Sequence, residues 1–222
     1  MVKCIKDYIK NRNIVVGCTN NCVYCYARIN NQRFHETPDF SKPVFFERKL
    51  KMLDKKTSGN YLLTGMSDLA DWEDEWKEII LKKIKENPQN ICLFLTKSPE
   101  RLDIHIDIDN AWFCVTVTCK ADLNRIQKLK KNVHGGHYHV TFEPIFEDLG
   151  ELNLDGIEWI VVGTETGKRK GKIDTKPEWA FHIAEQAQKR NIPVFMKEDL
   201  YGILCEEEMI QEFPKEFKKI EV

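Results

Sequence analysis

Short runs of branched and aromatic residues recur along the chain and predict its strands. These runs span residues 13–17, 60–65, 91–96, 111–117, 138–144, 158–163 and 192–197. Most of them are almost continuously apolar, which is the pattern of strands covered on both faces. We therefore expect a buried sheet rather than one with a solvated face.

Amphipathic periodicity between these runs predicts helices. The pattern is clearest in residues 72–86, where apolar residues recur at i, i+4, i+7, i+8 and i+12 and acidic residues precede lysines, as the helix dipole favours. Residues 121–131 repeat it, and residues 176–190 begin with Pro177 in a position typical of a first turn. Weaker helical patterns lie in residues 23–33, 44–56 and 205–213.

The alternation of strands and helices predicts an α/β fold with a mostly parallel sheet and helical crossovers. We see no internal repeat or linker, so residues 1–222 are interpreted as a single domain. The pattern alone fits an open doubly wound sheet and a curved barrel equally well.

The composition excludes some classes of protein. Of the 222 residues, 42% are hydrophobic and 31% are charged, and the formal net charge is -1. This charge gives no support for broad electrostatic binding to nucleic acid. No apolar run approaches the ~20 residues that span a bilayer, and the first residues lack the apolar core of a signal peptide. We expect no membrane association.

The eight cysteines do not have the distribution of a disulfide scaffold, because the chain is too long and too rich in core residues. Cys92 and Cys114 lie in predicted strands, where a thiol serves as a small buried hydrophobe. We therefore expect a reducing, cytoplasmic compartment.

Three cysteines stand apart from the others. Cys18, Cys22 and Cys25 form a C-x3-C-x2-C pattern in a polar loop directly after the first predicted strand. In parallel α/β folds, the carboxyl ends of strands carry the chemistry. Three cysteines with a purely structural role are rarely found so close together in a polar loop, so this spacing indicates a metal or cluster site.

Two kinds of site fit three close thiolates. Zinc favours four ligands, and His35 is available as the fourth, but the chain has no second C-x2-C pair. Cys114 and Cys119 are too far apart in sequence to form a knuckle. A four-iron cluster held by three thiolates leaves one iron open to a small molecule, whereas electron-carrier clusters use four cysteines.

The segment "CTNNCVYC", with aromatic Tyr24 before the last cysteine, resembles the signature of the radical S-adenosylmethionine (radical SAM) superfamily. The resemblance implies that Cys18, Cys22 and Cys25 bind a [4Fe-4S] cluster. It further implies that S-adenosyl-L-methionine chelates the fourth iron and that Tyr24 packs near its adenine.

A second segment, "LLTGMSD", ends a predicted strand where that family places a GGE-like turn that contacts the cofactor. The corresponding residues are Gly65, Met66, Ser67 and Asp68, which depart from two glycines and a glutamate. A plain glycine turn between strand and loop is the other interpretation.

Further segments at 139–145, 159–167 and 192–198 resemble small phage-associated radical SAM-like proteins and the radical SAM mobile pair proteins. This resemblance covers roughly residues 13–200. It implies a partial (β/α)6-type barrel with mostly parallel strands, and it makes a paired protein partner plausible.

The resemblance also implies a reaction. An external one-electron reductant of the flavodoxin or ferredoxin type reduces the cluster, and reductive cleavage of the cofactor gives a 5′-deoxyadenosyl radical that abstracts hydrogen from a substrate. Such a protein is oxygen-sensitive. The substrate is unknown, and a macromolecule fits an open barrel mouth.

Other polar residues at predicted strand ends complete the set of candidates. Each has a structural alternative. Thr116 and Thr118 either contact ribose or are β-branched residues that fill the sheet, and Glu143 and Glu165 either contact a ligand or form salt bridges. Lys97 and Lys197 either bind an anion or pair with those carboxylates, and Cys119 either donates a hydrogen atom or is an inert thiol. His137 and His139 share a strand face, and we interpret them as histidines of the barrel core.

Overall fold

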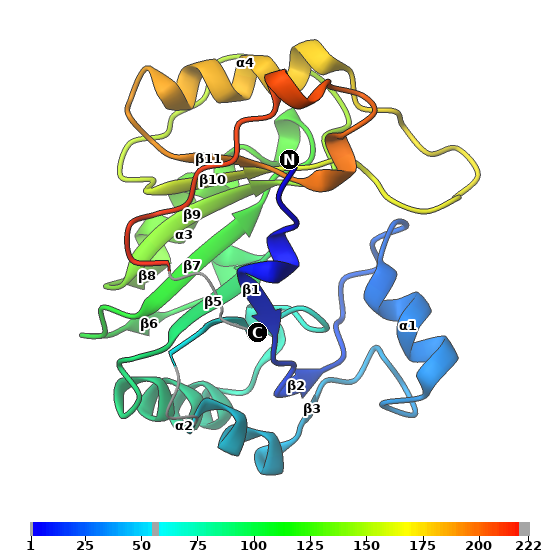
Figure 1. Ribbon diagram of the computed structural model, residues 1–222. Helices are drawn as coiled ribbons and strands as arrows, with labels where there is room; N and C mark the ends of the chain where they lie inside the picture. Colours follow the sequence, from blue (N-terminus) through cyan, green and yellow to red (C-terminus); the bar gives the residue numbers. More distant parts are fainter. Residues whose placement is uncertain (1, 55–57, 218–222) are drawn as a thin grey trace.

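Seven parallel strands form the main sheet of the computed structural model, which describes residues 2–54 and 58–217. Their order is β1-β4-β5-β7-β9-β10-β11, and every neighbouring pair is parallel. The bounds are β1 Ile9–Asn11, β4 Asn60–Leu62, β5 Ile91–Thr96, β7 Ala111–Thr116, β9 His137–Phe142, β10 Trp159–Val162 and β11 Val194–Met196. The sheet curls into a half-barrel (Figure 1), which confirms the predicted partial barrel.

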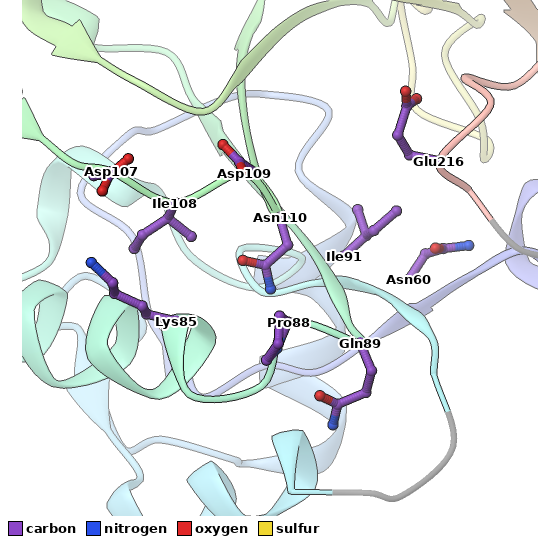
Figure 2. Close-up of a pocket in the computed structure, with 10 residues that line it drawn as sticks. All are labelled: Asn60, Lys85, Pro88, Gln89, Ile91, Asp107, Ile108, Asp109, Asn110 and Glu216. Carbon is purple, nitrogen blue, oxygen red and sulfur yellow. The ribbon is translucent and has the colours of Figure 1, made fainter.

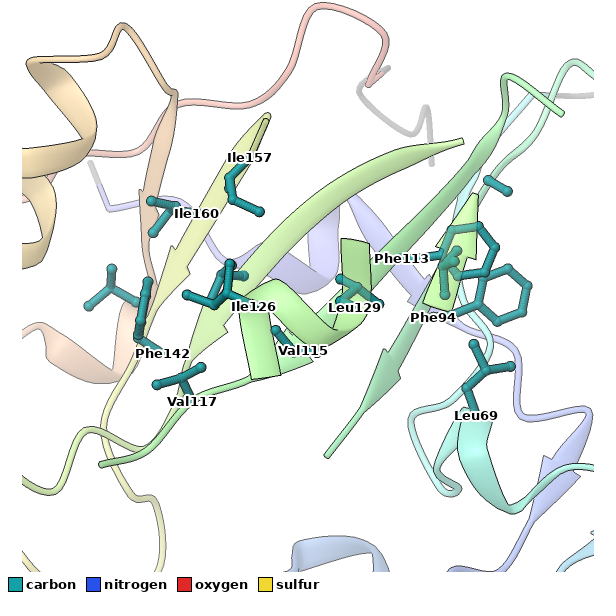
Figure 3. Packing of buried hydrophobic residues seen from close by; sticks show 14 of the residues in the cluster. Leu69, Phe94, Phe113, Val115, Val117, Ile126, Leu129, Phe142, Ile157 and Ile160 are labelled. Carbon is teal, nitrogen blue, oxygen red and sulfur yellow. The ribbon is translucent and has the colours of Figure 1, made fainter. Parts of the chain in front are cut away.

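Helices cover the convex face of this sheet. α2 (Asp74–Lys85), α3 (Asn124–Asn132) and α4 (Pro177–Gln188) direct their apolar stripes at outward-facing strand residues. Figure 3 shows Ile126 and Leu129 of α3 packed onto the strands. α1 (Tyr26–Phe34) lies beside the barrel rather than on its convex face (Figure 1).

The concave face has a separate apolar floor. Strand residues of the opposite parity, including Leu93, Trp112 and Trp159, form a second cluster, against which Phe213 and Phe217 of the C-terminal segment pack. Alternating residues therefore serve two cores, which explains why the strands are apolar on both faces.

An N-terminal segment, residues 3–8, crosses the open side of the half-barrel between β1 and β11. The Cys4 thiol donates to Glu198 Oε1 at 3.0 Å, the backbone N–H of Lys3 donates to Gln211 Oε1 at 2.6 Å, and the Tyr8 ring stacks on Phe213 at 4.3 Å. These contacts join the two edges of the sheet.

The predicted first strand, residues 13–17, is wrong as a strand of the main sheet. The edge strand is β1, and the apolar run forms β2 (Val15–Val16), which pairs antiparallel with β3 (Val44–Phe45). The chain turns between them, where Ile14 N–H bonds Arg12 O at 2.9 Å. The small strands β6 (Ile104–His105) and β8 (Val133–His134) form another two-stranded sheet.

Two weak helical predictions are also corrected. Residues 44–56 contain the 3-10 helix η2 (Glu47–Leu53) instead of an α-helix, with 55 and 56 outside the described residues. Residues 205–213 contain only the short η7 (Glu206–Glu208). Among residues 2–54 and 58–217, none of the helices has the length and apolarity to traverse a bilayer.

The convex core gives a first prediction. Phe113 is 1% exposed and stacks on Phe94 with ring centroids 5.3 Å apart, so Phe113→Ala should lower the free energy of unfolding by about 3–5 kcal/mol. Urea denaturation measures this loss. The matched control is Phe34→Ala, at a side chain 63% exposed, with an expected change within about 0.5 kcal/mol. Equal effects at both positions would contradict this packing.

Candidate functional site

A cavity of about 780 Å³ opens where the strands of the main sheet end. Most of the predicted site residues line it: Cys18, Cys22, Tyr24, Cys25, Gly65, Met66, Ser67, Asp68, Lys97, Thr116, Glu143, Glu165 and Lys197. The cavity thus lies at the carboxyl ends of parallel strands, the usual place of chemistry in such folds.

A glycine sets the start of the three-cysteine loop, residues 18–25. Gly17 has φ +119°, and a Cβ there would lie 2.7 Å from Pro43 Cα. Its N–H bonds Met66 O at 2.9 Å, and Cys18 N–H bonds Phe40 O at 2.7 Å. Only glycine combines this backbone conformation with such close approach.

The three thiols are free and partly exposed. Cys18 and Cys25 pack against one small apolar cluster that includes Phe40 and Met66. Cys25 caps α1, and its Sγ accepts the Arg28 N–H at 3.4 Å. Burial, with the nearby charge of Asp68, raises the pKa of Cys18 to about 12, so metal binding there would release a proton.

Asp68 ties this loop to the sheet. Its carboxylate accepts four hydrogen bonds, from Asn20 Nδ2 at 2.8 Å, Lys97 N at 2.8 Å, Ala70 N at 3.0 Å and Thr96 Oγ1 at 2.5 Å. Burial raises the pKa of Asp68 although these donors oppose the rise. Asp68 lines the cavity, so its contact with the cofactor stays a prediction, while both oxygens of its carboxylate already accept hydrogen bonds from the protein.

A second aspartate and an arginine complete the support. Asp71 accepts Thr19 N and Thr19 Oγ1, each at 2.7 Å, and Arg101 Nη1 at 2.8 Å. From α1, the Arg28 guanidinium donates to Cys18 O and Asn20 O. Sequence reasoning missed these residues because their partners are 8–52 positions away.

The two candidate lysines have different surroundings. Lys97 Nζ lies 5.8 Å from the Tyr24 ring centroid, and within the described residues no carboxylate pairs with it. Lys197 pairs with both Glu143 and Asp199. Burial alone would lower the pKa of Lys197, but the two carboxylates raise it overall. Of these two candidate lysines, Lys97 is therefore the one available to an anionic ligand.

Several other candidates are already engaged. Thr118 donates its hydroxyl to Asp122 Oδ2 at 2.8 Å and, like Cys119, is absent from the cavity lining, whereas Thr116 reaches the cavity. Glu165 binds Arg169 through two hydrogen bonds of 2.7 and 2.9 Å, which hold its pKa below the ordinary value.

The histidines do not complete a zinc site with the three cysteines. His35 lies at the far end of α1 from Cys25, about 15 Å along the helix axis. His137 pairs with Glu158 at 2.7 Å. His139 is buried, as expected of a barrel-core residue, but it also lines the cavity. Across residues 2–54 and 58–217, no three His, Cys, Asp or Glu side chains are grouped as ligands of one metal ion.

A second cavity, of about 360 Å³, lies at the opposite end of the sheet, where β4, β5 and β7 begin (Figure 2). Asn110, on its wall, donates to the carbonyls of Ile84, Asn87 and Asn90. None of the predicted site residues lines it. The hydrogen bonds of Asn110 connect the loop before β7 to the end of α2 and to the segment between α2 and β5.

Comparison with protein families shows to which family the chain belongs. A family model described as "Protein of unknown function (DUF5131)" matches residues 7–219. The chain belongs to this family. No curated protein and no solved structure gives a significant match. DUF5131 membership thus covers nearly the whole half-barrel, including the three-cysteine loop and the cavity.

The Asp71 contacts give a second prediction. Burial alone would raise the pKa of Asp71, but the bonds from Thr19 and Arg101 lower it, so its contribution to stability is present above about pH 4 and is lost as the pH falls. At neutral pH, Asp71→Ala should speed hydrogen exchange of the Thr19 amide by about tenfold or more, because the bond to a charged acceptor is lost.

Hydrogen exchange measured by NMR tests this, with core amides such as that of Val140 as the internal reference. The matched control is Asp74→Ala, at an exposed aspartate whose described partner is Lys77. Unchanged exchange at Thr19 in Asp71→Ala would show that Asp71 does not hold the loop.

Proposed function

We propose that this protein is a radical SAM enzyme that holds a [4Fe-4S] cluster through Cys18, Cys22 and Cys25. One observation carries the proposal: three thiols from one short loop meet a large cavity at the carboxyl ends of parallel strands. Among the described residues, no other cysteine lines that cavity. Three cysteine thiolates without a fourth would bind three irons of a [4Fe-4S] cluster and leave the fourth iron open to the cofactor.

The chemistry of the loop fits such a cluster. The thiols are free, and the Arg28 N–H donates to Cys25 Sγ, the kind of hydrogen bond that tunes a cluster's potential. When bound, the cluster supplies one electron for reductive cleavage of S-adenosyl-L-methionine to a 5′-deoxyadenosyl radical. The protein's part is to bind, orient and shield the reactants.

Within this proposal, Lys97 binds the carboxylate of the cofactor, because it lies beside Tyr24 and, unlike Lys197, forms no salt bridge with a carboxylate in the described chain. Tyr24 lies beside it, with an edge-to-face contact to Phe146 at 5.4 Å that fixes the ring. Thr116 offers a hydroxyl for the ribose. Asp68 acts indirectly, by positioning the three-cysteine loop.

The proposal requires partners. An external one-electron donor of the flavodoxin or ferredoxin type reduces the cluster, and a paired protein partner remains part of the proposal through the resemblance noted above. The substrate, which we propose enters the same cavity, is unknown, and a macromolecular segment is part of the proposal through the resemblance. Free thiols and an oxygen-sensitive cluster suit a reducing cytoplasm.

The third prediction tests the cysteines. After anaerobic reconstitution with iron and sulfide, the wild-type protein should hold about four irons and, on reduction with S-adenosylmethionine, form 5′-deoxyadenosine. Cys22→Ser should lose most of the iron and all product, because one of three anchoring thiolates is gone. Iron analysis, visible spectroscopy and product chromatography measure this.

Cys205→Ser is the matched control, because Cys205 is exposed and does not line the cavity. It should retain iron and product. A wild-type preparation that takes up one zinc and no iron under these conditions would overturn the proposal in favour of a zinc-stabilised binding module.

The fourth prediction tests Lys97 as a ligand of the cofactor. Lys97→Gln should weaken S-adenosylmethionine binding by about tenfold or more without loss of iron, because a charged hydrogen bond to the carboxylate is lost. Equilibrium dialysis measures the affinity, and Lys97→Arg should restore part of it. Lys42→Gln, at a side chain 82% exposed, is the control. Unaltered affinity in Lys97→Gln would remove this lysine from the cofactor site.

A further inference from the structure

Part of the cavity wall is not used by the cofactor in the proposed function. It is formed after β9, β10 and β11 by Glu143, Thr164, Lys197 and Asp199, which we call the acidic wall. All four belong to the segments that follow neighbouring parallel strands, so their positions are fixed by the sheet.

The acidic wall holds two carboxylates for one ammonium. Lys197 Nζ contacts Glu143 Oε1 and lies 3.2 Å from Asp199 Oδ2. Asp199 Oδ1 accepts the Thr164 N–H at 3.3 Å, so this carboxylate is engaged on both oxygens. Glu143 is engaged through Oε1, and its side chain is 27% exposed. The acidic wall therefore presents a hydrogen-bond acceptor, the Glu143 carboxylate, to the cavity, and its two carboxylates neutralise the charge of Lys197.

A buried hydroxyl on the same wall has no partner. Thr164 is 4% exposed, and its Oγ1 makes no hydrogen bond within the described part of the chain. An unpaired buried hydroxyl costs free energy, and native structures usually pair such groups with protein, water or ligand. A hydroxyl both donates and accepts, so a ligand group with the same dual character satisfies it.

The backbone of the wall is shaped to hold Glu143 and Lys197. A Cβ on Gly163 would lie 3.1 Å from Glu143 Cδ and 3.2 Å from Lys197 Cδ. Both side chains therefore pack directly against the glycine, and any larger residue would have to displace them. This close packing fixes the two charged groups before a ligand arrives.

One uncharged polar side chain, His139, lies in the otherwise apolar floor next to this wall. His139 lies in β9, four residues before Glu143, and its Nδ1 is buried without a hydrogen bond in the described residues. Burial lowers the pKa of His139 to about 3, so the ring is neutral near pH 7. Trp159 lies beside it, with ring centroids 5.4 Å apart.

An anion is a poor match for these surroundings, because it would face two carboxylates and a lysine that is already paired. A neutral group with adjacent hydroxyls matches better, because each hydroxyl donates to a carboxylate and accepts from threonine or lysine. We propose that the acidic wall is a substrate subsite for an uncharged sugar ring. This inference rests on the proposed function for its role in catalysis, though binding itself needs no cluster.

The fifth prediction uses the full chain, metal-free and reduced, in ligand-observed NMR titrations. The probes are methyl β-D-ribofuranoside, ribose 5-phosphate and uridine. We expect the neutral riboside to bind at least about tenfold more tightly than the phosphate, because the phosphate meets like charge. Uridine binding tighter than the riboside would identify the source as a nucleoside, and equal binding would indicate a free sugar.

Two variants assign the binding to this wall. Glu143→Gln and Gly163→Ala should each weaken riboside binding by about tenfold, while Glu151→Gln, at an exposed residue outside the cavity lining, should not. Urea denaturation confirms that each variant is folded. Absence of riboside binding, phosphate binding of equal strength, or unchanged binding in both variants would overturn the inference. None of these binding results depends on formation of 5′-deoxyadenosine. Failure of the proposed function would appear in the iron and product assays of the third prediction, independently of these titrations.

Discussion

The buried carboxylate of Asp68 connects the parts on which the candidate site depends. Its four donors come from the three-cysteine loop, the turn after β4 and the end of β5. Burying a charge is unfavourable unless it is hydrogen-bonded, so the loop and the strand ends are held in one arrangement that satisfies it. The position of the thiols thus follows from the register of β4 and β5 rather than from the loop alone.

The strands that lie in the middle of the sheet could be predicted from the sequence because burial on both faces leaves a continuous apolar run. Residues 91–96 coincide with β5. The edge was predicted less well. β1 (Ile9–Asn11) has one buried residue, and the neighbouring Lys10 and Asn11 are polar, so the more apolar residues after it were taken as the strand. Local composition does not distinguish an edge strand of three residues from a turn.

The candidate site was predictable where its chemistry is local. Three cysteines within eight residues are visible in any reading of the chain. By contrast, Lys97 and Lys197 both follow an apolar strand and look alike in sequence. Their surroundings differ because Asp199 and Glu143 pair with Lys197, while Tyr24 lies beside Lys97. Asp199 is two residues from Lys197, but Glu143 follows a different strand, β9, and Tyr24 comes from the three-cysteine loop, so these two contacts form only in the folded chain.

The N-terminal segment that joins the edges of the half-barrel affects how the chain acquires its structure. Cys4 and Glu198, which bond to each other, are 194 positions apart. During synthesis on the ribosome, Cys4 cannot make this contact until Glu198 has been synthesised. Closure of such a long loop carries a large entropic cost and is associated with slow folding. Until then β1 has an unprotected edge, and the nascent chain is at its most vulnerable to aggregation.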